Sequence, residues 1–579
     1  MPRTAQCNNR RTTPNLLLPS LLLAASTAFA QQSTTPQTTP PAAMPPVPSV
    51  PGVPQAAQQA ASLINPENIR AHVRFLAGDL LEGRGPGKRG AELASEYIAT
   101  EFALNGLKPA GDSGTFLQKV DLYAVHTDEA ATKFTFLPQK GAPVPLAYNT
   151  DYVVKDERGE PTADIEAPIV FVGYGIDAPE YGWNDYKGVD VKGKILLVIV
   201  NEPASDDEKF FKGKTMTYYG RWTYKYEQAA RLGAVGVLII HRTDLASYPW
   251  AVVQNSQAIE KSYLKGDPLA TLRAASWIQL DTARKLMTVS GLDLDKEIEA
   301  AGKRGFKPVE LPVRLQAHVA SVVRPYTSTN VTGKVEGADT TEKDAVLYSA
   351  HYDHLGIDPN AKGDGIYNGA ADNGTGCGIL IELGRAYAQA GTPPPHTVYF
   401  SSVTAEEQGL LGSAYLGMHP PVPAQDIALD LNYDELLPIG IPTSTKVSGS
   451  ERTQFYPVVE KTAQAFGLTI QPDQFPMAGS YYRSDHFSLA RVGIPSFSIG
   501  EGTLFQGHDP QWGSDQMKDY TAHHYHQPSD EYHADMDFRG DARMAQFGLM
   551  LGWQASAGAT TEWKAGDEFE AARKKSTGQ

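Results

Sequence analysis

Cysteine is almost absent from this 579-residue chain, which contains only Cys7 and Cys377. Cys7 falls in a segment that we expect to be removed on export, so the mature chain cannot form an internal disulfide. Its stability must therefore come from a buried core. Cys377 lies in the apolar helical run NGTGCGILIEL, where a small buried hydrophobic residue is expected rather than a nucleophile.

Positive charge is also in short supply. The chain has 51 Lys and Arg against 66 Asp and Glu, which gives a formal net charge of -15. Nonspecific binding to nucleic acid or anionic lipid needs a basic surface that neutralises phosphates. The composition therefore argues against both kinds of partner and leaves peptide substrates open. A hydrophobic content of 41% and a charged content of 20% are normal for a globular protein.

The apolar run near the amino terminus, residues 16–25, is well short of the roughly 20 residues that span a bilayer. Three arginines precede it, and Ala28-Phe29-Ala30 follows. This layout predicts a cleavable secretory signal over residues 1–30, against the rival interpretation of a retained anchor. We therefore expect an exported protein, periplasmic or secreted, with no integral membrane association after cleavage. Loss of three arginines and no acidic residue would lower the net charge from -15 to -18.

Charged residues are missing from residues 31–60, which consist mostly of Pro, Gln, Thr, Ala and Val. Such a composition favours extended polyproline geometry over packing. We expect a linker over residues 31–63, with ordered structure beginning near Ile64. The runs NPENIRAHVRFLAGDLL and ELASEYIATEFALNGL then predict two helices, the first with Asn65 as a candidate cap.

The pattern of predicted secondary structure changes twice in the rest of the chain. Residues 162–314 contain short β-rich runs and are predicted to form an inserted module. The flanking segments, 64–161 and 315–557, are predicted to form one catalytic α/β domain. From Asn330 onward, strands alternate with helices, which indicates a mostly parallel central sheet flanked by helices. Residues 558–579 are left as a carboxy-terminal tail, and the sequence carries no signal for an oligomeric state.

Side chains that can bind a metal directly follow three of the predicted strands. The run AVLYSA leads into His351 and Asp353, VYFSSVTA leads into Glu406 and Glu407, and IALDLNY leads into Asp434. In open α/β sheets the working residues gather at the carboxyl ends of the strands. Asp353 lies two residues beyond His351 and could hold its imidazole in place. Adjacent glutamates point in different directions, so one can bind a metal while the other takes a proton from water.

Two further segments contain possible metal ligands, but the sequence pattern alone allows more than one role for each. Asp372 lies in the glycine-rich turn NGAADNGTG before a helix, where it is either a ligand or an ordinary helix cap. The run TAHHYHQPSD contains His523, His524 and His526, which form a metal-binding loop, a pH-sensitive surface or a chance cluster. No HExxH, CxxC, GxSxG or GxxxxGK[ST] motif occurs, which excludes several hydrolase and nucleotide-binding classes.

Taken in order, HYDHLG, NGAADNGTG, AEEQGLLGS, LNYDE, RSDHFSLARVGIP and YHQPSDE resemble the motif series of the M28 peptidase family, which contains co-catalytic zinc aminopeptidases. The resemblance covers about residues 64–555. The run IVFVGYGIDAPEYGWNDYKGVDVKGKILLVIV, with ARLGAVGVLIIH, is similar to the protease-associated (PA) domain often found in this family. The resemblance implies the phosphorylase/hydrolase-like fold of zinc exopeptidases.

The resemblance also implies roles for individual residues. Two zinc ions per chain would be held, one by His351 and Asp434, the other by Glu407 and His526, with Asp372 bridging them. His523 and His524 would then be surface residues.

In the same resemblance, Glu406 is the general base that activates a metal-bridging water, and Asp353 orients His351. Tyr525 would donate to the oxyanion and Arg483 would contact substrate. The implied activity is removal of amino-terminal residues from peptides. The chain departs from many relatives at Ala370-Ala371, where they are more acidic, and at Glu435, where they have a hydrophobic residue.

Other functions compatible with the fold stay open. Dipeptidase or carboxypeptidase action is the main alternative, because Arg483 could bind a substrate carboxylate. An acyltransferase like the glutaminyl cyclases, which use a single zinc, and a catalytically silent binding protein are the others. The complete set of candidate ligands favours the peptidase.

Overall fold

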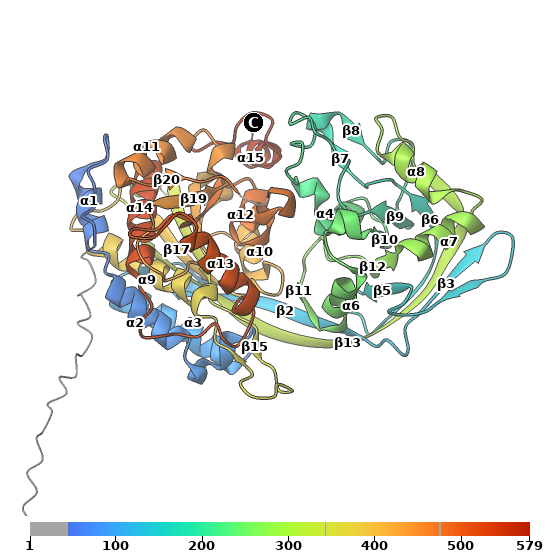
Figure 1. The fold of residues 1–579 in the computed structure, drawn as a ribbon, viewed down its shortest axis with the longest axis horizontal. Coiled ribbons are helices and arrows are strands. Elements are labelled where there is room, and N and C mark those ends of the chain that lie inside the picture. Colours follow the sequence, from blue (N-terminus) through green and yellow to red (C-terminus); the bar gives the residue numbers. More distant parts are fainter. Residues whose placement is uncertain (1–43, 342, 474–475, 579) are drawn as a thin grey trace, which may run out of the picture. The chain divides into compact units, whose positions relative to one another are not determined.

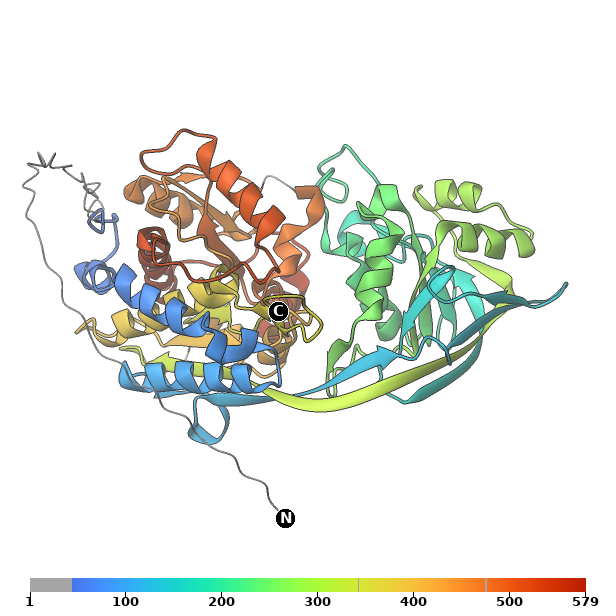
Figure 2. The same ribbon diagram turned by 60° about the horizontal axis from the view of Figure 1, so that its bottom comes forward.

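The computed structural model describes residues 44–341, 343–473 and 476–578. The predicted signal (1–30) and the first part of the predicted linker (31–43) lie outside these residues. Within them, no helix is both long and apolar enough to cross a membrane. Contacts group residues 46–579 into one compact unit, and Figures 1 and 2 show its ribbon from two sides.

The predicted linker is wrong for its last part. Helix α1 (Gln55–Ser62) lies inside it, and Ala57, Ala60 and Ala61 are fully buried where α1 packs against α14 (Arg539–Ser556). The physical reason is the spacing of these small residues, which gives the helix an apolar stripe without any large side chain. Folded structure therefore begins before Ile64.

The two helices predicted after Ile64 are confirmed. They are α2 (Pro66–Leu76) and α3 (Arg89–Leu104). The side chain of Asn65 accepts a hydrogen bond from the amide of Glu67, as expected of a cap.

The sheet of the predicted catalytic domain, called the catalytic sheet below, has parallel strands at its centre and antiparallel strands at its edges. Its order is β11-β2-β13-β17-β14-β18-β21-β19-β20. The four central strands run parallel: β17 (Val398–Val403), β14 (Ala345–His351), β18 (Ile427–Tyr433) and β21 (Ser496–Glu501). The other strands in this order are β11 (Lys261–Leu264), β2 (Leu117–Thr127), β13 (Val309–Val335), β19 (Ser444–Ser448) and β20 (Thr469–Ile470). The short strand β1 (Lys108–Pro109) also pairs with β13.

Helices cover both faces of this sheet. On one face Tyr348 stacks on Phe400 next to α9 (Gly376–Ala388) and α14. On the other face Leu347 packs with residues of α10 (Leu411–Met418) and α12 (His486–Arg491). Because successive side chains of a strand point to opposite faces, both faces are apolar. The predicted α/β class is confirmed.

A second sheet forms the core of the insertion. Its order is β4-β3-β13-β6-β9-β10-β12-β5, with β6 (Thr162–Phe171), β9 (Ile195–Ile199), β10 (Gly236–His241) and β12 (Ala274–Gln279) parallel. Strands β3 (Lys133–Pro138), β4 (Val144–Leu146) and β5 (Tyr152–Lys155) precede the predicted start at residue 162. These strands are short and lack the apolar runs that mark the later ones, so the sequence places the boundary too late. Strand β13 contributes to both sheets (Figure 2).

The carboxy-terminal segment is folded rather than a free tail. Trp563 and Phe569 are buried, and α15 (Glu570–Thr577) follows them. Asp567 accepts hydrogen bonds from the guanidinium of Arg452 at 2.8 and 2.9 Å. The segment therefore completes the catalytic domain at its edge.

Candidate metal centre

Three parallel strands end at one point of the catalytic sheet. His351 is the last residue of β14, Glu406 and Glu407 follow β17, and Asp434 follows β18. Since β14 lies between β17 and β18, the carboxyl ends of the strands bring these side chains together. The backbone bends sharply beyond two of the strands, because Ala405 has a φ of 55° and Glu435 one of 57°.

Asp372 reaches the same point from a tight turn before α9, Ala370–Thr375. The turn starts at Gly369, which has a φ of 60°; a Cβ there would lie 2.2 Å from the carbonyl oxygen of Asp372. The sequence therefore needs glycine at this position. The carboxylate of Asp530 accepts the amides of Ala371 at 3.0 Å and Asp372 at 3.1 Å, which fixes the turn.

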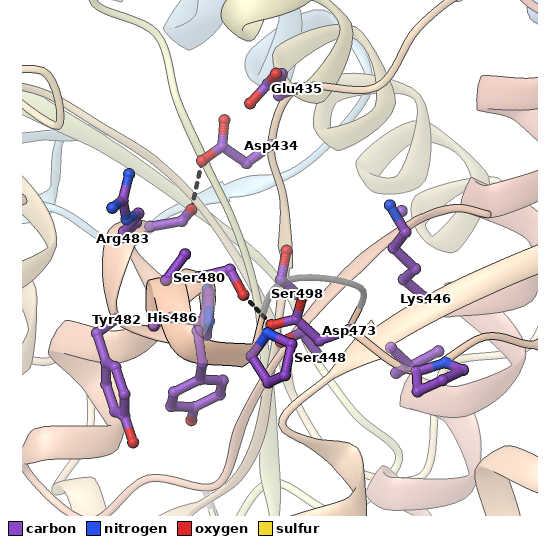
Figure 3. A pocket seen from close by; sticks show the side chains of 18 of the residues that line it. Asp434, Glu435, Lys446, Ser448, Asp473, Ser480, Tyr482, Arg483, His486 and Ser498 are labelled. Carbon is purple, nitrogen blue, oxygen red and sulfur yellow. Dashed lines mark hydrogen bonds between the residues drawn. The ribbon is translucent and has the colours of Figure 1, made fainter. Parts of the chain in front are cut away.

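One group of candidate ligands consists of His351, Asp372 and Asp434. His351 Nε2 lies 3.0 Å from Asp434 Oδ1 and 3.4 Å from Asp372 Oδ1. Asp434 is held by the hydroxyl of Ser484, which donates to its Oδ2 (Figure 3). This group matches the predicted partners of the first metal.

A second group lies on the other side of Asp372. His526 Nε2 lies 3.3 Å from Asp372 Oδ2 and 3.1 Å from Glu407 Oε2. A further histidine, His354, is fully buried, and its Nδ1 lies 2.6 Å from Glu407 Oε1 and 3.9 Å from Asp372 Oδ2. The sequence analysis missed His354, although it stands inside the motif HYDHLG, three residues after His351.

The charges of the centre suit bound cations. Burial opposes protonation of His526, but hydrogen bonds that its imidazole donates to the carboxylates of Asp372 and Glu407 raise its pKa to about 10. Burial also opposes protonation of His351, but the carboxylates of Asp434 and Glu406 raise its pKa well above the ordinary value. Without a metal, protons on the histidines thus offset the excess of carboxylates. Metal ions would replace these protons, and imidazole with carboxylate is a donor set that zinc takes.

Asp353 lies behind the ligands, and Glu406 lines the cavity beside them. His351 Nδ1 lies 3.1 Å from the backbone carbonyl of Asp353 and 3.8 Å from its carboxylate. That carboxylate accepts the amide of Glu406 at 3.0 Å, so Asp353 contacts both the histidine and the predicted base. Burial raises the pKa of Glu406 well above its usual range, and the charge of Glu407 adds to the effect.

The centre opens into a cavity of about 1450 Å³. Tyr525 and Arg483 line it, as do Lys212, Thr215 and Met216 of the insertion. The ring of Tyr525 stacks on that of His526 with centroids 3.9 Å apart. Figure 3 shows Arg483 close to the dashed hydrogen bond that ends on Asp434.

Four further residues that the sequence analysis considered are not among the candidate ligands. Cys377 is buried, and its thiol donates to the carbonyl of His351. His523 and His524 are exposed to 67% and 39%, in line with the prediction of a surface position. Glu435 lines the cavity next to Asp434, and burial raises the pKa of its carboxyl group well above the usual value.

Comparisons with known proteins agree with this arrangement. Residues 330–550 match the model described as Peptidase family M28. A probable zinc metalloprotease of Pyrenophora tritici-repentis is 34% identical over 118 residues, which are 20% of this chain and 23% of that protein. Aminopeptidase YwaD of Bacillus subtilis is 32% identical over 93 residues, 16% of this chain and 18% of that one. The chain thus matches less than a quarter of the length of both relatives.

Among solved structures, an aminopeptidase from Aneurinibacillus sp. strain AM-1 is 16% identical, with a TM-score of 0.44 and coverage of 88% of this chain and 97% of that one. The region matched by the family model contains every candidate metal ligand from His351 to His526. Residues 330–550 are therefore similar to peptidase family M28.

Proposed function

We propose that the chain is an aminopeptidase whose metal centre holds two zinc ions. The observation that carries this proposal is the position of Asp372, whose two oxygens face different histidines, His351 at 3.4 Å and His526 at 3.3 Å. A carboxylate with this placement can bridge two cations. The family match, and the partial match to an aminopeptidase of Bacillus subtilis, support peptide amino termini as the substrate.

In this proposal His351 and Asp434 hold one zinc, Glu407 and His526 hold the other, and Asp372 is shared. When bound, the zinc pair supplies Lewis-acid stabilisation of a carbonyl oxygen and lowers the pKa of water at the centre. His354 donates to Glu407 and keeps that ligand in place.

Glu406 is the proposed general base. It lines the cavity beside the ligands, and its raised pKa gives the carboxylate affinity for a proton. It would accept a proton from the attacking water and return it to the leaving amine. The hydrogen bond from its amide to Asp353 restricts where the side chain can lie.

Tyr525 is the proposed oxyanion donor. Burial raises the pKa of its hydroxyl group, which therefore stays protonated at neutral pH and can donate a hydrogen bond. Its ring is held against His526, so the hydroxyl keeps a defined position near the ligands.

The test combines a peptide panel, metal analysis and the variant Glu406→Gln. We expect the full-length mature chain to release amino-terminal residues from unblocked peptides and to bind about two zinc ions. Glu406→Gln should lower kcat by at least 10²-fold without loss of metal, because general-base catalysis contributes about 10² to 10⁴.

Other outcomes point elsewhere. Cleavage of amino-blocked peptides would contradict the aminopeptidase. Bound metal with no hydrolysis would favour the acyltransferase or a binding protein.

A second candidate, dipeptidase or carboxypeptidase action, is favoured by Arg483. Its guanidinium lines the cavity and can pair with a substrate carboxylate. Cleavage restricted to dipeptides or to free carboxyl ends would support it over the aminopeptidase.

We also infer that the protein is exported and that the insertion is a PA domain. The supporting observations are the signal-like layout of residues 1–30 and the resemblance of the β-rich runs between residues 162 and 314. The mass of the mature chain isolated from the cell exterior would reveal cleavage after Ala30.

A further inference from the structure

An arginine of the insertion lies close to the cavity without lining it, and a second arginine, from the catalytic domain, is one of the lining residues. Arg221 precedes helix α4 (Trp222–Arg231) in the insertion, and Arg483 ends the short helix Ser480–Arg483 in the catalytic domain. Gly479, just before that helix, lies against the insertion: a Cβ there would be 3.6 Å from Cδ of Arg221 and 3.0 Å from Sδ of Met216. The insertion and the segment of the catalytic domain around Gly479 are therefore in contact here.

Neither arginine has a carboxylate partner within the described part of the chain. Nε of Arg221 is buried and lacks a hydrogen-bond partner. Burial and the charge of Arg483 together lower the pKa of Arg221 to about 10, against the opposing charges of Tyr248 and Tyr482.

Neighbouring cations differ in this respect. Arg452 pairs with Asp567 at 2.8 Å, and Lys212 lies 3.7 Å from the same carboxylate. The charge repulsion between Arg221 and Arg483 is unfavourable without a counter-ion, and two such cations stand out in a chain with a net charge of -15. An anionic ligand would remove this cost.

The arginines lie close to the proposed reaction centre. Arg483 is adjacent to Ser484, whose hydroxyl donates to the candidate ligand Asp434. Arg483 and Asp434 line the same cavity, to which the insertion contributes Met216. The same cavity is therefore lined by candidate metal ligands and by the insertion.

We propose that Arg221 and Arg483 form a subsite that receives a carboxylate of the peptide substrate. This deepens the function proposed above and rests on it. Two guanidinium groups offer forked donors that fit a carboxylate, so recognition depends on arginine and not only on positive charge. The carboxylate is either the carboxy terminus of a short peptide or an acidic side chain.

Binding to a zinc-loaded Glu406→Gln protein tests the subsite without turnover. Calorimetry would compare the tripeptide Leu-Ala-Ala with its carboxamide, and Leu-Glu-Ala amide with Leu-Gln-Ala amide. The first pair reports a terminal carboxylate and the second an acidic side chain. We expect one of the acids to bind about tenfold or more tightly than its neutral partner, as for a hydrogen-bonded charge.

Arg221→Gln, added to the same protein, should bring that ratio close to one, and Arg221→Lys should retain only part of it. Arg284→Gln is the matched control, because Arg284 belongs to the insertion but pairs with Asp281 and Asp295 on its surface. Zinc content and circular dichroism verify folding. Equal binding of acid and amide in both pairs, or a preference that survives Arg221→Gln, overturns the subsite. Absence of hydrolysis by the unmutated enzyme would overturn the aminopeptidase instead.

Discussion

Asp530 supports the metal centre without being one of its proposed ligands. Its carboxylate accepts two successive backbone amides of the turn that presents Asp372, and it also accepts the hydroxyl of Tyr520 at 3.2 Å. Asp530 stands four residues after His526. One short segment therefore supplies a candidate ligand and fixes the backbone of another.

Asp530→Asn should weaken metal binding. Asparagine keeps one acceptor oxygen where the carboxylate has two, so one of the amides at Ala371 and Asp372 loses its partner. We expect a 10- to 100-fold loss of zinc affinity, the usual effect of changing a group that supports a ligand. Competition with a chromogenic chelator measures it. Asp519→Asn is the control, since the partners of Asp519 among the described residues are the exposed His523 and His524. Equal affinity in both variants would contradict the role of Asp530.

His72 should make the free energy of unfolding depend on pH, independently of the metal centre. It is buried on α2, its Nδ1 lies 2.8 Å from the hydroxyl of Tyr97, and burial lowers its pKa to about 4. In the unfolded chain the pKa of His72 is the ordinary 6.5. Between about pH 4 and 6.5 the unfolded chain therefore binds more protons than the folded one. The free energy of unfolding rises with pH over this range, and this stability is lost on acidification.

His72→Gln should flatten this part of the pH profile. The 2.5-unit difference corresponds to roughly 3 kcal/mol at most. Urea unfolding at pH 4.5 and 7.5 would measure it, and an equal pH effect in both proteins would show that His72 does not titrate in this way.

At the scale of elements, the strand ends could be predicted from the sequence because each is an apolar run followed by polar residues. The fold class and the meeting of His351 with Asp434 follow from that pattern. Asp372 could be chosen over a helix cap only with the family resemblance, since its position depends on a turn and on Asp530, 158 residues later.

Elements with weak apolar patterns were harder to predict. Helix α1 has no side chain larger than glutamine, and its burial depends on α14, almost 500 residues away along the chain. Strands β3 to β5 are short, and they join their sheet through β13 and β12, both far downstream. Long-range packing of this kind leaves little trace in a local window of sequence.

For the whole molecule, removal of zinc should lower thermal stability. Buried carboxylates of Asp372, Glu407 and Asp434 would lose the cations that offset their repulsion, while ligand binding stabilises a fold by about 4 kcal/mol when free metal exceeds Kd a thousandfold. We expect dialysis against a chelator to lower the Tm, zinc to restore it and magnesium not to. An unchanged Tm in protein shown to be metal-free would contradict a zinc centre.

Strand β13 pairs with β6 and β3 in the sheet of the insertion and with β2 and β17 in the catalytic sheet. Its 27 residues form one strand, and its pairing with β6 shifts register only between Glu310 and Arg314, well before the passage into the catalytic sheet. A deletion of a single residue near Val322 would invert the side-chain alternation of one sheet relative to the other. Insertions and deletions during evolution should therefore be tolerated in the loops of either module but not in this strand, because its length sets the side-chain alternation of both sheets at once.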